Sequence, residues 1–134
     1  MPPSTDRPIL VIDDDADLRE TVGDILGYEG YSIATASNGA DGLQYLRTHP
    51  APALIILDYW MPEINGSAFV EALKREPAWA DIPIAVVTAD LKAAELVQQL
   101  GIDALVTKPM KMEELLGLAK RFVDGDDHVP ARGA

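Results

Sequence analysis

The chain has 134 residues and 48% of them are hydrophobic, so it can form one domain of ordinary size with a real core. Its 22 acidic residues outnumber its 11 basic residues, and the net charge of −11 argues against a basic surface for nucleic acid or an anionic membrane. Cysteine is absent, no apolar run reaches the roughly 20 residues of a membrane helix, and the N-terminus has no apolar signal core. We therefore expect a cytoplasmic protein without disulfides, thiolate metal sites, nucleic-acid partners or membrane partners.

Short apolar runs alternate with longer helical patterns along the chain. In chain order, the predicted strands cover 9–12, 31–36, 53–57, 82–87 and 104–107. The first, third and fourth runs are almost continuously apolar, which is typical of strands buried on both faces of a parallel sheet. The second and fifth runs are weaker or shorter, which favours positions at the edges of the sheet.

A helical pattern follows each predicted strand. After Asp15, a plausible N-cap, four apolar residues recur on one helical face. The second helix is predicted to span 40–47, and the fourth to end before Gly101. The apolar positions that mark the five helices are Leu18, Val22, Ile25 and Leu26; Leu43 and Leu46; Phe69, Val70 and Leu73; Leu96, Val97 and Leu100; and Met112, Leu115, Ala119 and Phe122. Five strand–helix repeats predict an α/β fold, with a parallel sheet, helices on both faces and right-handed crossovers.

The two ends of the chain are polar or rich in proline and glycine, without a periodic apolar pattern. We therefore expect flexible tails at 1–7 and 124–134 around a folded domain of residues 8–123. The second tail is too short for a DNA-binding or enzymatic output domain, so the domain is expected to act alone.

Polar side chains gather where the predicted strands end. The first strand is followed by Asp13 and Asp14, the third by Asp58, the fourth by Thr88 and the fifth by Lys108. Parallel strands bring their carboxyl ends to one edge of the sheet, which is where ligand sites form in open α/β sheets. That edge is therefore predicted to collect three carboxylates, a hydroxyl and an ammonium.

Helix capping is the simpler explanation for polar residues in strand-to-helix loops. It accounts for Asp15 and for one further acid of the same loop. It explains Asp58 poorly, because the next helix begins only near Gly66, and it explains Lys108 poorly, because a cation is unfavourable at a helix N-terminus. Asp58 and Lys108 are therefore candidates for a chemical role.

Carboxylates drawn together repel one another, and a hard divalent cation would relieve this repulsion. Mg²⁺ takes oxygen ligands, one or two of them carboxylates, and Mn²⁺ could replace it. Zinc is disfavoured because cysteine is absent and the two histidines stand far apart, at 49 and 128. An aspartate beside Mg²⁺ and a lysine is suited to attack a phosphoryl group and form an acyl phosphate.

Four motifs together resemble the receiver domain of bacterial two-component response regulators. They are VIDDD at 11–15, LIILDYWMPEING at 54–66, IAVVTA at 84–89 and LVTKP at 105–109. Each motif is weak alone, but their order and intervals make the combination specific, and the resemblance covers residues 8–123. It implies a flavodoxin-like, doubly wound, five-stranded parallel sheet of order 2-1-3-4-5 with five helices.

The resemblance also implies roles for individual residues. Asp58 matches the phosphoacceptor, and Asp13 and Asp14 match the acidic pair that holds Mg²⁺ beside it. Asp58 itself and the backbone carbonyl of Trp60 would complete the protein's ligands to the metal. The Trp60 side chain is expected over the mouth of the site, with Asp90 at the other side of that mouth.

Thr88 and Lys108 complete the implied site. The Thr88 hydroxyl would bind the phosphoryl group, and Lys108, before an implied cis Pro109, would contact a phosphoryl oxygen. The family usually carries Tyr or Phe three positions before the lysine, where the ring turns inward as the threonine moves. Here that position is Leu105, so the aromatic half of this switch is missing. The departure concerns output and leaves the phosphorylation chemistry intact.

The resemblance implies a stand-alone receiver that accepts a phosphoryl group from a histidine kinase onto Asp58 with Mg²⁺ and loses it by slow self-catalysed hydrolysis. Such a protein is a signalling phosphoacceptor and not an enzyme. Its output would be contact with a downstream protein or transfer to a histidine phosphotransfer domain, and Leu105 mildly favours the relay.

Two other classes of protein are weighed against this interpretation. An aspartyl-phosphate phosphatase or mutase would carry a second acid two residues after its nucleophile, where this chain has Trp60. A degenerate receiver that only docks proteins would be expected to lack Asp14, Asp58 or Lys108, and all three are present. The phosphorylated receiver is therefore the leading interpretation, and the docking module is the alternative.

Overall fold

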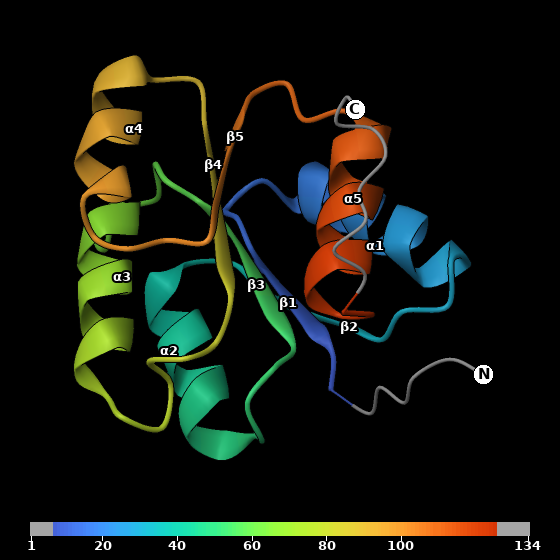
Figure 1. Ribbon diagram of the computed structural model, residues 1–134, viewed down its shortest axis with the longest axis horizontal. Helices are drawn as coiled ribbons and strands as arrows, with labels where there is room; N and C mark the ends of the chain where they lie inside the picture. Colours follow the sequence, from blue (N-terminus) through green and yellow to red (C-terminus); the bar gives the residue numbers. More distant parts are fainter. Residues whose placement is uncertain (1–6, 126–134) are drawn as a thin grey trace.

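The computed structural model describes residues 7–125 as a five-stranded parallel sheet between two layers of helices (Figure 1). The strands are β1 (Ile9–Ile12), β2 (Ile33–Ala36), β3 (Leu54–Asp58), β4 (Ile84–Thr88) and β5 (Ala104–Thr107). The helices are α1 (Ala16–Tyr28), α2 (Gly39–Thr48), α3 (Gly66–Arg75), α4 (Leu91–Gln98) and α5 (Met112–Phe122). The strand order is β2-β1-β3-β4-β5 and every neighbouring pair is parallel, so the predicted flavodoxin-like fold is confirmed.

The predicted tails, 1–7 and 124–134, lie outside the described residues except for Arg7, Asp124 and Gly125. Arg7 donates from its guanidinium to the carbonyls of Ala51 and Pro52, each at 3.0 Å, beside the start of β3. Within the described part of the chain, no helix has the length and apolar character needed to cross a membrane.

Helices α2, α3 and α4 cover one face of the sheet, and α1 and α5 cover the other (Figure 1). Alternate strand residues therefore enter two cores: in β1, Leu10 and Ile12 face the first layer and Ile9 and Val11 face the second. All residues of β1, β3 and β4 are buried, as predicted for strands enclosed on both faces. The two weaker strands, β2 and β5, lie at the edges, also as predicted.

The central strands end one residue later than predicted. β3 ends on Asp58 and β4 on Thr88, so both polar residues belong to the paired ladder and not to the loops. β4 also starts two residues late, at Ile84, because Pro83 has no N–H for the ladder. Being held in the ladder restricts the backbone of both polar residues more than a loop would.

Three other boundaries or faces differ from the sequence prediction. β2 begins at Ile33 because the turn that ends α1 extends to Tyr31, whose N–H donates to a carbonyl of that helix. α2 begins one residue early, at Gly39, because the Asn38 side chain caps its first turn. Met112 was predicted to face the core but is 57% exposed, because it is the first residue of α5.

Helix α4 buries a different face from the predicted one. Asp90 caps the helix, which begins at the next residue and buries Ala93, Ala94 and Val97. Leu96, predicted to face the core, is 56% exposed. A helix buries one apolar stripe, and a stripe through the small side chains and Val97 leaves its neighbour Leu96 toward solvent.

The loop after β3 turns back sharply on the end of that strand. The Gly66 N–H donates to the Tyr59 carbonyl at 2.7 Å, and a Cβ at Gly66 would lie 2.6 Å from Tyr59 Cδ1. Asn65 caps α3 by accepting from the Ala68 N–H at 3.0 Å. The loop therefore keeps Tyr59 and Trp60 at the carboxyl end of the sheet.

Candidate functional site

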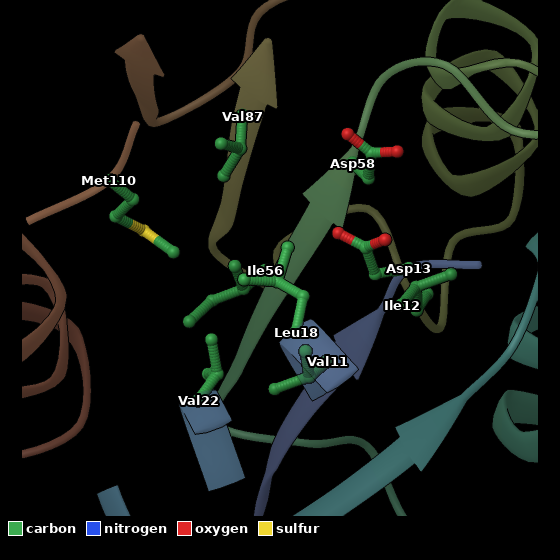
Figure 2. A pocket seen from close by; sticks show the side chains of 9 residues that line it. All are labelled: Val11, Ile12, Asp13, Leu18, Val22, Ile56, Asp58, Val87 and Met110. Carbon is green, nitrogen blue, oxygen red and sulfur yellow. The ribbon is translucent and has the colours of Figure 1, made fainter. Parts of the chain in front are cut away.

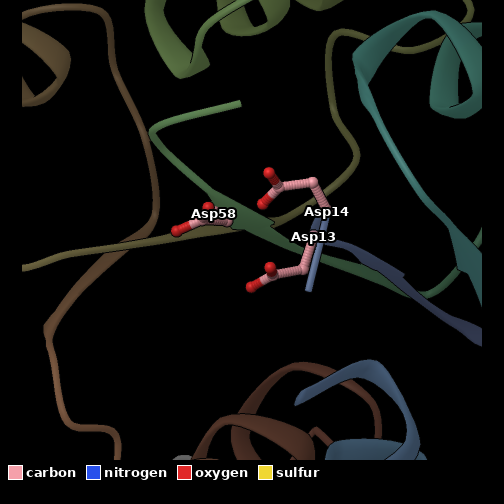
Figure 3. Close-up of side chains that lie close together, drawn as sticks. All are labelled: Asp13, Asp14 and Asp58. Carbon is pink, nitrogen blue, oxygen red and sulfur yellow. The ribbon is translucent and has the colours of Figure 1, made fainter. Parts of the chain in front are cut away.

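The carboxyl ends of β1 and β3 bring three aspartates together. Ile12 pairs with Leu57 in the parallel ladder, so the residues that follow them, Asp13 and Asp58, are neighbours. With Asp14, each offers a carboxylate oxygen, and these oxygens all lie within 4.8 Å of one another (Figure 3). Asp13 and Asp58 are only 5% and 6% exposed, whereas Asp14 is exposed. The cluster thus has a buried side and a solvent side.

Lys108 reaches this cluster from the end of β5. Its Nζ lies 2.9 Å from Asp58 Oδ1, and its backbone N–H donates to the Thr88 carbonyl at 3.1 Å. The peptide bond from Lys108 to Pro109 is cis, as the family resemblance implied. The ammonium therefore neutralises one of the three carboxylates and leaves the other two uncompensated.

Thr88 lies at the same edge, but its hydroxyl is engaged in the β4–α4 loop. The side chain is 2% exposed, and Oγ1 accepts from the Asp90 N–H at 3.1 Å. The register places Asp58 opposite Val87, the residue before Thr88. The predicted hydroxyl is therefore close in the fold to Asp58, although its hydrogen bond points along its own loop.

The two buried carboxylates stand over an apolar floor. Apolar side chains line a small cavity beside them, with contributions from β1, α1, β3, β4 and the β5–α5 loop (Figure 2). These residues are Val11, Ile12, Leu18, Val22, Ile56, Val87 and Met110. Such a floor offers no polar atoms to an ionised carboxylate, so charge there is poorly solvated.

Burial raises the pKa of Asp13 from its ordinary 3.8 to about 6. The Asp15 N–H, which donates to Asp13 Oδ1 at 2.9 Å, opposes this rise in pKa. The charges of Asp58 and Asp14 raise the pKa further, and the Lys108 ammonium lowers it. Asp13 therefore holds its negative charge at neutral pH against both desolvation and like charge.

The ion pair of Asp58 and Lys108 is also shaped by burial. Burial raises the pKa of Asp58, and the bond to Lys108 holds that rise back. Burial alone would lower the pKa of Lys108, but the bond to Asp58 and the charges of the three aspartates outweigh it and raise that pKa. The ammonium is thus firmly protonated, and the 2.9 Å contact is a charge-assisted hydrogen bond.

The donor set fits a hard divalent cation such as Mg²⁺. Three carboxylate oxygens converge, one ammonium leaves them with an excess of negative charge, and no histidine or cysteine among residues 7–125 belongs to the cluster. Asp13, Asp14 and Asp58 could hold the ion from one side, while the exposed side of the cluster leaves room for its waters.

Trp60 lies at this edge, but its side chain binds Asp90. The indole Nε1 donates to Asp90 Oδ2 at 3.3 Å, and the Trp60 side chain is 55% exposed. Sequence reasoning placed both residues at the mouth of the site but missed their direct bond. One signal about Asp90 was present in the sequence: it lies two residues after Thr88 and directly before the next helix, where an N-cap is expected.

Arg19 is a second residue that sequence reasoning missed. Its Nη1 donates to the Asp13 carbonyl at 2.7 Å and so fixes the backbone beneath the acidic cluster. The only available signal was its position one helical turn after the predicted N-cap Asp15.

The family model described as "Response regulator receiver domain" matches residues 9–120, which is most of the chain. The protein belongs to the response regulator receiver family. In two-component signalling, such receivers interact with histidine kinases, take a phosphoryl group on an aspartate and generally bind Mg²⁺ at an acidic pocket of this kind.

Curated relatives of this receiver include two longer regulators. The DNA-binding dual master transcriptional regulator RpaA of Synechocystis is 33% identical over 124 residues, which are 91% of this chain and 51% of the relative. The phosphate regulon transcriptional regulatory protein PhoB of Escherichia coli is 35% identical over 116 residues, 85% of this chain and 50% of the relative. The receiver spans about half the length of the curated relatives it matches.

Solved receivers have the same fold. The signal receiver domain of a histidine kinase from Syntrophus aciditrophicus superposes with a TM-score of 0.82 at 30% identity, over 93% of this chain and 96% of that chain. The chemotaxis protein CheY4 of Vibrio cholerae superposes with a TM-score of 0.78 at 26% identity, over 87% of this chain and 98% of that chain.

Proposed function

We propose that Asp58 accepts the phosphoryl group from a histidine kinase in a Mg²⁺-dependent reaction. The observation that carries this assignment is the position of its carboxylate at the tip of β3, 2.9 Å from the Lys108 ammonium and within the cluster of Asp13 and Asp14. Among the described residues, Lys108 forms an ion pair with Asp58 and with neither of the other two acids, and its ammonium can follow a transferring oxygen.

The proposed reaction breaks the phosphorus–nitrogen bond of a phosphohistidine and forms a phosphorus–oxygen bond to the Asp58 carboxylate. Asp13 and Asp14, with Asp58 and the Trp60 carbonyl, would hold Mg²⁺, which when bound neutralises charge on the phosphoryl oxygens. The Lys108 ammonium moves from the carboxylate to a phosphoryl oxygen and stabilises the charge there. The rigid ladder keeps Asp58 in place throughout.

Thr88 is proposed to bind the phosphoryl group with its hydroxyl. For this the hydroxyl has to turn from the β4–α4 loop, where it accepts from the Asp90 N–H, toward Asp58. Leu105 is half-buried against the core and offers no polar tip, so this position has no aromatic ring to follow the movement of Thr88. Output is proposed to be protein contact or transfer to a histidine phosphotransfer domain, with hydrolysis ending the signal.

The relatives support two arrangements of the whole protein. CheY4, whose chain is matched over 98% of its length, supports a receiver that acts alone, as proposed from the sequence. RpaA and PhoB, which are about twice as long, support a receiver joined to a further region. An immunoblot of the native protein at its source distinguishes the two by mass.

Phosphorylation is tested by incubation with Mg²⁺ and acetyl phosphate, followed by intact mass. We expect the mass gain of one phosphoryl group, its loss with hydroxylamine as for an acyl phosphate, and its absence in Asp58→Asn. Asp24→Asn, at an exposed site on α1, is the matched control and should behave like the parent. A full gain in Asp58→Asn would refute the assignment, and no gain in the parent protein would favour the alternative of a docking module.

A further inference from the structure

We propose that Asp90 is a positioning residue: it holds the Trp60 indole and the start of α4 in the resting arrangement and releases the indole when Asp58 is phosphorylated. The proposal rests on the proposed phosphorylation of Asp58. It assigns to this receiver a route from its site to α4 that needs no aromatic residue at position 105.

The two carboxylate oxygens of Asp90 have separate partners. Oδ1 accepts from the N–H groups of Lys92 at 2.9 Å and Ala93 at 3.3 Å, and so caps α4. Oδ2 accepts from Trp60 Nε1 at 3.3 Å. One side chain therefore ties the first turn of α4 to the loop that follows Asp58, across the ends of β3 and β4.

The backbone of Asp90 is tied to Thr88. The Asp90 N–H donates to Thr88 Oγ1 at 3.1 Å in a partly buried part of the loop. When the Thr88 hydroxyl turns toward a phosphoryl group on Asp58, this acceptor leaves the Asp90 N–H. An N–H without a partner is costly where water is scarce, so the loop and the Asp90 carboxylate shift with it. The 3.3 Å bond to Trp60 is then lost.

This arrangement supplies a response that Leu105 cannot give. The Trp60 indole has a single polar atom, Nε1, which donates to the Asp90 carboxylate. The backbone N–H of Asp90 donates to the Thr88 hydroxyl, so Asp90 connects the indole to Thr88. Leu91 directly follows Asp90 and is 74% exposed, so a shift at the start of α4 displaces an apolar side chain on the surface. A change of population between the two arrangements is then visible to a partner protein.

Two variants separate the bond to the indole from the cap of α4. In Asp90→Asn the side-chain oxygen can still cap the helix, because Asn is as good an N-cap as Asp, but its NH₂ then faces the indole N–H. Asp90→Ser also keeps a capping oxygen, and its shorter side chain does not reach the indole. Trp60→Phe removes the same bond from the other side. A Trp79→Phe background leaves Trp60 as the sole tryptophan, whose fluorescence can be excited apart from that of the tyrosines.

The first measurement needs no metal. In the Trp79→Phe background, Asp90→Asn and Asp90→Ser should raise acrylamide quenching of Trp60, while the circular dichroism spectrum at 25 °C stays the same as the parent's and shows that the variants are folded. Glu95→Gln, on the exposed side of the same helix, should leave the quenching unchanged. Equal quenching in the parent and both Asp90 variants would overturn the proposal.

The second measurement is the affinity for beryllofluoride with Mg²⁺, by calorimetry. A bond present only in the resting arrangement opposes activation, so Asp90→Asn and Trp60→Phe should each tighten binding by about 2- to 10-fold. The double variant should gain no more than either single variant. Unchanged affinity, or gains that multiply, would overturn the proposal. No binding by the parent protein would instead overturn the proposed phosphorylation, and the proposal with it.

Discussion

Asp13 carries an electrostatic cost that an asparagine in its place would remove. Burial raises its pKa from 3.8 to about 6, a difference of about two units. At 1.36 kcal/mol per unit, this difference corresponds to about 3 kcal/mol of folding free energy. The folded protein binds the proton more tightly than the unfolded chain. Protonation of Asp13 therefore stabilises the folded protein. This stabilisation is complete below about pH 3.8 and is lost as the pH rises through about 6.

The perturbation is Asp13→Asn, which keeps an oxygen to accept from the Asp15 N–H and removes the charge. In EDTA at pH 7.5, the variant should be more stable than the parent by up to about 3 kcal/mol. At pH 4 the two proteins should differ little, because most Asp13 side chains in the folded parent are then protonated. Urea unfolding at both pH values, with linear extrapolation, measures the difference in free energy. Asp24→Asn serves as the control for removal of an exposed acid from α1.

Magnesium adds a second arm to the same experiment. Ligand that binds only the folded state raises its stability by RT ln(1 + [L]/Kd), so Mg²⁺ should stabilise the parent at pH 7.5. Asp13→Asn should gain less, and Asp14→Ala should gain least, because magnesium keeps several waters and Asp13 is expected to bind partly through one. A parent that is more stable than Asp13→Asn at pH 7.5 in EDTA, or a difference independent of pH, would refute the reasoning about burial. Equal stabilisation of all three proteins by Mg²⁺ would refute the metal role.

Four further outcomes are expected. Lys108→Ala should fold, as judged by circular dichroism, but lose its response to beryllofluoride, because the ammonium that contacts a phosphoryl oxygen is then missing; an unfolded variant would point to a structural role. Leu105→Ala should cost about 1–2 kcal/mol in urea unfolding, since the side chain is only half-buried, and a loss of partner binding confined to the phosphorylated state at unchanged stability would contradict this. Gly66→Ala should cost about 1–3 kcal/mol, because its Cβ would lie 2.6 Å from the Tyr59 ring; unchanged stability would show that the loop can yield. Beryllofluoride should change tryptophan fluorescence in the parent but not in Trp60→Phe, and a signal carried by the other tryptophan would contradict the assigned position of Trp60.

Local patterns in the sequence were sufficient for the α/β class and for the strands, whereas the strand order was predicted from the family resemblance. A strand enclosed on both faces has to be apolar throughout, so the runs that became β1, β3 and β4 are visible without any knowledge of their partners. The N-cap Asp15 can also be predicted from the sequence alone, because its hydrogen bonds reach only two and three residues along the chain. The gathering of Asp13 and Asp58 then follows from parallel pairing of β1 and β3.

Tertiary structure alone decided which side chains meet across loops and which helix face is buried. Helix α4 contains both large and small apolar residues, and only its contact with the sheet shows that Val97 is buried and Leu96 is not. The bond from Trp60 to Asp90 joins residues 30 positions apart, which no periodic pattern encodes. The pKa of Asp13 likewise depends on an apolar floor assembled from five segments, because desolvation depends on every atom around a charge and not on its neighbours in sequence.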